Sequence, residues 1–143
     1  MLFRSIDECN RLRAGEGLSA LRVTDEMMAI SMVQGNASAY TMNHMRAYNV
    51  GENLAWGYSS YFGGPFSGWY TEEKKEYQAG NTGAAGHYLN IVNSGYTVTG
   101  FATNQYGDYG ITHEQSFRGR TSGQSYSVAE YRARLKPFYE AHK

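Results

Sequence analysis

The hydrophobic pattern changes near Gly83, and this change constrains the fold class more than any other feature. Before it, the start signals Ser5-Ile6-Asp7-Glu8 and Thr24-Asp25-Glu26 precede segments with helical spacing. After it, short segments rich in β-formers alternate with turn residues. A capping box at Ser127-Val128-Ala129-Glu130 then opens a terminal helix. Helices segregated from antiparallel strands predict an α+β fold, with a sheet layered between helices.

The helical signals predict four helices. These cover residues 5–14, 25–40, 67–79 and 128–143. Methionines dominate the expected buried face of the second helix, which consists of Met27, Met28, Met32 and Val33. Pro137 is expected to kink or interrupt the last helix, because proline lacks the backbone N–H that a helix interior needs.

Three β-rich segments are predicted to form an antiparallel meander. They cover residues 88–92, 97–103 and 111–117, separated by Asn93-Ser94-Gly95 and Tyr106-Gly107-Asp108. The earlier segment 51–53 is expected to be a turn, and residues 54–57 are expected to form either a helical turn or a short extended piece. Loops are predicted around His44 and over residues 58–66.

Composition limits the classes of function. A chain of 143 residues is long enough for one domain, residues 1–143, with a substantial core. Its 13 basic and 13 acidic residues give no net charge, which argues against a nucleic-acid partner and a polybasic membrane surface. No apolar run approaches the roughly 20 residues of a transmembrane helix. The single cysteine, Cys9, excludes an internal disulfide and is expected to be structural rather than nucleophilic.

The first residues do not read as a signal peptide. We therefore expect either a protein that is not exported or a domain excised from a longer exported precursor.

Four ionisable side chains from separate segments could share one cleft. They are His44, Glu52, Glu73 and His87. His87 follows Gly86 at the start of the expected strand, an edge position where a neutral imidazole can bind metal. The spacings form no local zinc motif. His113, in the third β-rich segment, is a further candidate for the same region, whereas His142 is expected at the surface.

The choice between Glu72 and Glu73 depends on helix faces. Glu73 lies four residues from both Trp69 and Tyr77, so these three side chains are expected to share one face, with Trp69 and Tyr77 anchoring the helix. Glu72 is the alternative. The alternative without a functional role is that these acidic residues, together with Lys74 and Lys75, form a solvated helical surface.

Together these motifs resemble a bacterial domain of the CAP superfamily, which includes cysteine-rich secretory proteins, insect venom antigens and plant pathogenesis-related proteins. The resemblance spans nearly the whole chain. It rests on Gly51-Glu52-Asn53-Leu54-Ala55, on Trp69 with Glu73 and Tyr77, and on Gly86-His87-Tyr88. The chain departs from the family pattern at Cys9, where a histidine is usual, and at Asn93, where a tryptophan is usual.

The resemblance implies an α-β-α sandwich with a small central antiparallel sheet and a groove holding His44, Glu52, Glu73 and His87. It also implies a secreted or cell-surface location, with the two histidines binding a divalent cation such as Zn²⁺. A lipid, sterol or peptide would be the ligand of a binding module. The alternatives are a hydrolase, with Glu52 or Glu73 as base, and a cell-wall or host-interaction module with a vestigial groove.

Overall fold

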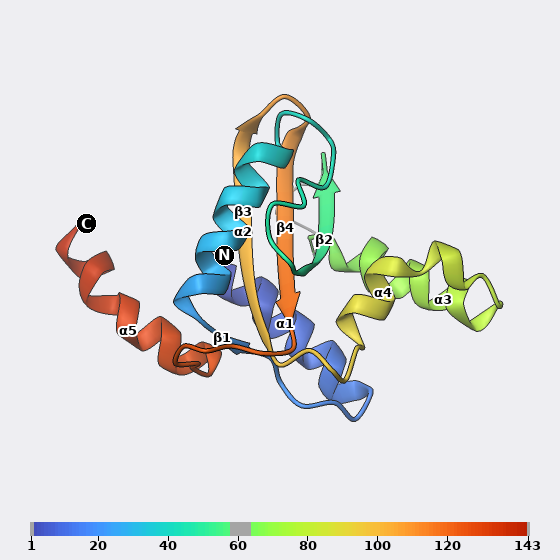
Figure 1. Ribbon diagram of the computed structural model, residues 1–143, viewed down its shortest axis with the longest axis horizontal. Coiled ribbons are helices and arrows are strands. Elements are labelled where there is room, and N and C mark those ends of the chain that lie inside the picture. Colours follow the sequence, from blue (N-terminus) through green and yellow to red (C-terminus); the bar gives the residue numbers. More distant parts are fainter. Residues whose placement is uncertain (1, 58–63, 143) are drawn as a thin grey trace.

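The computed structural model describes residues 2–57 and 64–142. Figure 1 shows a central sheet with helices around it. The helices are α1 (Leu2–Gly15), α2 (Asp25–Ser38), the π-helical η1 (Ser67–Glu72), α3 (Glu73–Gln78), the 3₁₀ turn η2 (Thr82–Ala84), α4 (Gly86–Ile91) and α5 (Val128–Ala141). The strands are β1 (Arg22–Val23), β2 (Gly51–Trp56), β3 (Val98–Gly107) and β4 (Gly110–Arg118).

The sheet has the order β1-β3-β4-β2. Strands β3 and β4 form a hairpin, and β2 pairs antiparallel with β4 at one edge. The two-residue strand β1 pairs parallel with β3 at the other edge. The fold is therefore α+β, and β2 is an edge strand that can border a cleft.

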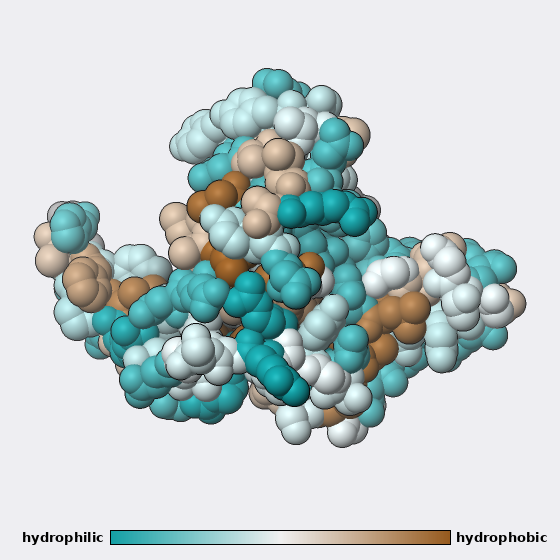
Figure 2. Space-filling view, in the orientation of Figure 1, coloured by the Kyte–Doolittle hydropathy of each residue, from teal (hydrophilic) through white to brown (hydrophobic). Residues whose placement is uncertain are grey.

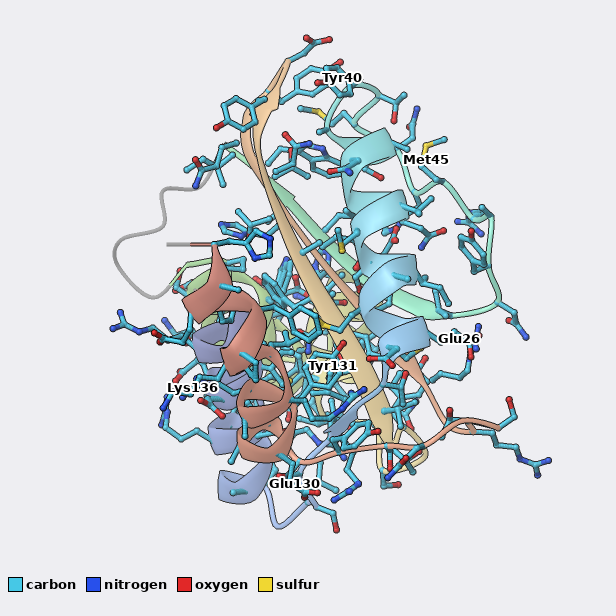
Figure 3. The ribbon with its side chains drawn as sticks, turned by 90° about the vertical axis from the view of Figure 1, so that its left-hand side faces the viewer. Glu26, Tyr40, Met45, Glu130, Tyr131 and Lys136 are labelled. Atoms are coloured by element: carbon cyan, nitrogen blue, oxygen red, sulfur yellow. The ribbon has the colours of Figure 1, made fainter. Side chains whose placement is uncertain are left out.

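Helices cover both faces of the sheet. Figure 3 shows α2 on one side of the strands and α1 with α5 on the other. Helix α2 crosses β3 at Gly100, where an added Cβ would collide with the backbone of Met27. On the α1 side, Phe101, Phe117 and Ile6 are fully buried in the main apolar cluster. This layering matches the predicted sheet between helices.

The predicted meander is wrong in its first segment. Residues 88–92 lie mostly in α4, so His87 stands near the start of a helix rather than of a strand. A short apolar run fits either structure, and here Tyr88 and Ile91, three positions apart, are the buried residues of one helical face. The other two segments form β3 and β4, as predicted.

The motif 51–53, predicted as a turn, begins strand β2 instead. Hydrogen bonding with β4 overrides the turn preference of the Gly-Glu-Asn sequence, because Glu52 stands opposite Ser116 and Asn53 opposite Gln115. Residues 54–56 continue the same strand, which selects the extended alternative. Of the predicted loop 58–66, residues 58–63 lie outside the described part of the chain.

Two of the three predicted helix starts are confirmed. Thr24 accepts a hydrogen bond from the Met27 N–H, and Ser127 forms a full capping box with Glu130. The predicted box at Ser5 is wrong, because α1 already begins at Leu2. Pro137 lies inside α5 and does not interrupt it.

The buried face of α2 differs from the predicted methionine face. Met27 and Met28 are buried, but Met32 and Val33 are more than half exposed, at 54% and 52%. The other buried residues of α2 are the apolar Ile30 and four small or polar residues, Ser31, Gln34, Gly35 and Ser38. The helix therefore presents polar groups to the sheet, near the candidate site.

Candidate functional site

One open cleft of about 470 Å³ brings the four predicted side chains together. It is lined by His44, Glu52, Glu73, Gly83, Ala84, Gly86, His87 and Asn90. Strand β2 provides Glu52, the segment between α2 and β2 provides His44, α3 provides Glu73 and α4 provides His87. Residues far apart in sequence thus form one surface that carries four ionisable side chains.

Glu52 holds the first imidazole. Its Oε1 lies 2.7 Å from His44 Nδ1, and its Oε2 accepts a hydrogen bond from Gln34 Nε2 at 2.5 Å. The side chain of Glu52 is 6% exposed and that of His44 is 42% exposed. A buried carboxylate therefore orients a more accessible ring.

Glu73 holds the second imidazole. Its Oε2 lies 2.5 Å from His87 Nδ1, and its Oε1 accepts the backbone N–H groups of His87 at 2.8 Å and Tyr88 at 3.3 Å. These amides belong to the first turn of α4, where backbone donors have no partner within the helix. The Glu73 carboxylate thus fixes both the N-terminal end of α4 and the His87 ring that α4 carries.

Trp69 supports the same imidazole from the other helical segment. Its indole stacks on the His87 ring, with centroids 5.8 Å apart and planes 19° apart. Its Nε1–H donates to the Leu54 carbonyl of β2 at 3.1 Å. Trp69 is buried, as predicted.

The predicted common face of Trp69, Glu73 and Tyr77 holds only in part. Trp69 and Glu73 both contact His87, but Tyr77 is 43% exposed and packs on Tyr88. Trp69 lies in the π-helical η1, whereas Glu73 and Tyr77 lie in α3, so a single four-residue period does not run through all three positions.

Asparagine side chains also form hydrogen bonds along the edge of β2 that does not pair with β4. Asn90 Nδ2 donates to the Glu52 carbonyl and to Asn53 Oδ1, at 3.3 and 2.9 Å. Asn53 Nδ2 donates in turn to the His87 carbonyl at 3.2 Å. These amides join α4 to β2 and fix the two sides of the cleft relative to one another.

A buried arginine fixes the far end of α4. Arg13 of α1 is 2% exposed, and its Nη1 donates to the carbonyls of Ile91 and Asn93 at 2.7 and 3.0 Å. Its Nε donates to the Ser19 carbonyl at 2.9 Å. The guanidinium fork therefore ties the helix that carries His87 to the helix behind the sheet.

Gly51 admits a neighbouring aromatic ring. A Cβ at this position would collide with the hydroxyl of Tyr96. The first residue of the Gly-Glu-Asn motif is thus fixed by packing, and Glu52 takes its position directly beside that contact.

The donor atoms define what the cleft can hold. A carboxylate only accepts hydrogen bonds, so Nδ1 of each neutral ring carries the hydrogen and Nε2 keeps its lone pair. A carboxylate bonded to Nδ1 is the usual outer partner of a metal-binding histidine. Within residues 2–57 and 64–142, however, no cluster of three or more His, Cys, Asp or Glu side chains could hold a metal ion. The two Nε2 atoms are the donors that the cleft could offer to a metal ion, and water or a ligand would have to supply the remaining positions.

Other candidate residues lie outside the cleft. Glu72 is exposed and lies 3.5 Å from Lys75, so Glu73 is the glutamate of this pair that lines the cleft. His113 is buried against Phe101, and burial lowers its pKa to about 4. Cys9 is buried, and desolvation raises the pKa of its thiol to about 11. His142 is exposed at the end of α5, as predicted.

Sequence reasoning missed Gln34 and Asn90. Both side-chain amides donate hydrogen bonds to Glu52. Gln34 donates to the Glu52 carboxylate, and Asn90 donates to the Glu52 backbone carbonyl. No signal in the sequence marked Gln34, because its burial depends on how α2 packs on the sheet. Asn90 gave none, because it belonged to a segment predicted as a strand.

The fold and the cleft together define an α+β domain with two carboxylate-held imidazoles. The model of the Cysteine-rich secretory protein family, CAP, matches residues 6–114. This match covers more than half of the chain, which therefore belongs to the CAP family. No curated protein is similar enough in sequence to match the chain. Within the described residues, no helix has the length and apolar character needed to cross a bilayer.

Proposed function

We propose that this CAP domain is an extracellular binding module whose cleft holds a divalent cation, with Zn²⁺ the best match, together with a ligand. His44 and His87 would provide Nε2 as metal ligands, while Glu52 and Glu73 orient the rings through Nδ1. A bound cation would supply positive charge and open coordination positions in the cleft. A typical catalytic zinc has three protein ligands. A site with only two protein ligands is better suited to a cation that binds reversibly.

The observation that carries this proposal is the engagement of both carboxylates. Glu52 uses one oxygen for His44 and the other for Gln34. Glu73 uses one oxygen for the His87 ring and the other for backbone amides. A general base needs an oxygen directed at the water that it deprotonates. These contacts favour an orienting role over the base required by the hydrolase alternative.

The cleft lining favours a polar ligand. Its larger side chains are imidazoles, carboxylates and the Asn90 amide, and the other described residues that line it are glycine and alanine. Lipid and sterol sites are lined mainly by apolar side chains. Among the three ligand classes, a peptide is therefore the best match.

Calorimetric titration with Zn²⁺ tests the metal assignment. His44→Ala and His87→Ala should each abolish Zn²⁺ binding with the fold intact, and His142→Ala is the matched control because this exposed histidine lies outside the cleft. In wild type, affinity should decrease as pH falls, because protons compete with the metal for Nε2. Unchanged affinity in either cleft variant would reject the assignment.

The same protein distinguishes a binder from a hydrolase. The wild type should not turn over peptide or ester libraries, and Glu52→Gln and Glu73→Gln should change Zn²⁺ affinity only modestly. General-base catalysis contributes about 10²–10⁴-fold to rate, well above assay scatter. Hydrolysis that disappears in either glutamine variant, with metal content unchanged, would support the hydrolase instead.

A further inference from the structure

A third glutamate lies on the strand next to Glu52, outside the set that the sequence singled out. Glu114 of β4 is fully buried, at 0% exposure. Leu54 stands opposite Glu114 and Ser116 opposite Glu52, so the two glutamates are diagonal neighbours on one face of the sheet. Helix α2 closes over this face, where a Cβ on Gly35 would lie 3.2 Å from the Cβ of Glu114.

Two donors already occupy one oxygen of Glu114. Its Oε2 accepts from Ser116 Oγ at 2.6 Å and faces Gln34 Nε2 at 3.5 Å. Its Oε1 is buried and meets no donor among the described residues. A carboxylate in this position would leave one charged oxygen unsatisfied in the interior, which is costly.

A proton on Glu114 resolves this arrangement. The carboxyl groups of Glu52 and Glu114 both face Gln34 Nε2, at 2.5 and 3.5 Å, and two carboxylates that share one amide group would repel each other. Burial, followed by the hydrogen bond and charge of Glu52, raises the pKa of Glu114 well above its ordinary range. A protonated Glu114 can donate its O–H, whereas Glu52 is already an acceptor for His44 and Gln34.

We propose that Glu114 remains a neutral carboxylic acid above the pH at which an ordinary glutamate ionises, and that it donates a hydrogen bond to Glu52 and thereby positions the carboxylate that holds His44. Glu114 is a positioning residue, since it reaches the cleft only through Glu52. The polar face of α2 serves the same arrangement, with Gln34 bonding Glu52 and facing Glu114. Sheet, helix and cleft are thus coupled through two carboxyl groups that share one proton.

The pH dependence of stability tests the protonation state. From α2 the polar groups near Glu114 are Ser31 and Gln34, and from β4 it is Ser116. The ionisable group whose charge acts on Glu114 is Glu52 of β2. Because the pKa of Glu114 is raised on folding, its contribution to stability is complete below the unfolded value of about 4.5 and is lost as pH rises through the folded value.

Glu114→Gln keeps a neutral donor in place and removes this dependence. The ratio of the wild-type folding constant to that of Glu114→Gln should fall about tenfold per pH unit between the unfolded and folded pKa values of Glu114, and then level off. His113 acts in the opposite direction, since its pKa is lowered, but it is present in both proteins and cancels in the ratio. Glu72→Gln, which removes an exposed carboxylate, is the matched control. A ratio that is constant or rises with pH would overturn the proposal.

Two nuclear magnetic resonance measurements complete the test without metal, so their outcome is independent of zinc binding. In wild type, the ¹³C shift of the Glu114 carboxyl should report a pKa above 4.5, and titration at or below that value would overturn the proposal. Glu114→Leu removes the donor to Glu52 and should shift the ring ¹⁵N resonances of His44, while Glu114→Gln preserves them. The His87 ring, held by Glu73, is the internal control. An unchanged His44 ring in Glu114→Leu would overturn the positioning role.

Discussion

Glu73 illustrates how single side chains organise this cleft. Its carboxylate binds the His87 ring and two backbone amides of α4, while Trp69 stacks on the same ring. Glu52 plays the matching part for His44. At this scale, the site consists of two imidazoles, each oriented by one carboxylate, rather than of four independent ionisable groups.

Truncation of Trp69 should destabilise the fold and also remove a contact of the cleft. It is 3% exposed, bonds the Leu54 carbonyl and supports His87. Trp69→Ala should lower the free energy of unfolding by on the order of 3–5 kcal/mol, the usual cost of truncating a buried aromatic residue. Tyr77→Ala, on the exposed side of the same helical segment, should cost about 1 kcal/mol or less. Urea denaturation of both variants measures the difference, and equal losses would contradict the burial of Trp69.

The helix caps supply a comparison at the scale of elements. Ser127 caps α5 with both hydrogen bonds of a capping box, whereas Ser5 lies inside α1. Ser127→Ala should cost about 1 kcal/mol of stability. Ser5→Ala should be nearly neutral, since alanine is the better helix former in an interior position. Thermal denaturation of both variants measures the difference, and a larger loss in Ser5→Ala would mean that α1 begins at Ser5 after all.

Which elements could be predicted follows from how local their causes are. Thr24 and Ser127 mark helix starts through contacts three residues away, and both were predictable. Strand β2 exists because it pairs with β4, about sixty positions later in the chain, and no local pattern contains that information. Helix α4 was missed because its apolar run is too short to separate helix from strand.

The candidate site was easier to predict than the elements that carry it. His44, Glu52, Glu73 and His87 were identified from motifs, and all four line one cleft although the predicted turn and strand around Glu52 and His87 were wrong. Glu73 could be chosen over Glu72 because it lies one helical turn after Trp69, and both residues contact His87. Glu114 and Gln34 could not be assigned, because their importance depends on α2 crossing β4, a contact that spacing does not reveal.

Across the whole molecule, the cleft lies at the β2 edge of the sheet, between helical segments that are tied to its core. Asn90 and Trp69 join α4 and η1 to β2, and Arg13 joins α4 to α1. On the face drawn in Figure 2, hydrophilic and hydrophobic residues are interspersed. The architecture therefore fixes α4, which carries His87, against β2, whose Glu52 holds His44, as the proposed cation site requires.

A crystal of the wild-type protein soaked in Zn²⁺ and measured at the zinc absorption edge tests this arrangement most directly. The account predicts one anomalous peak in the cleft, about 2.0–2.1 Å from Nε2 of both His44 and His87, with Glu52 and Glu73 still on the Nδ1 atoms. A cleft without a peak, or zinc bound to only one of these two histidines, would contradict it.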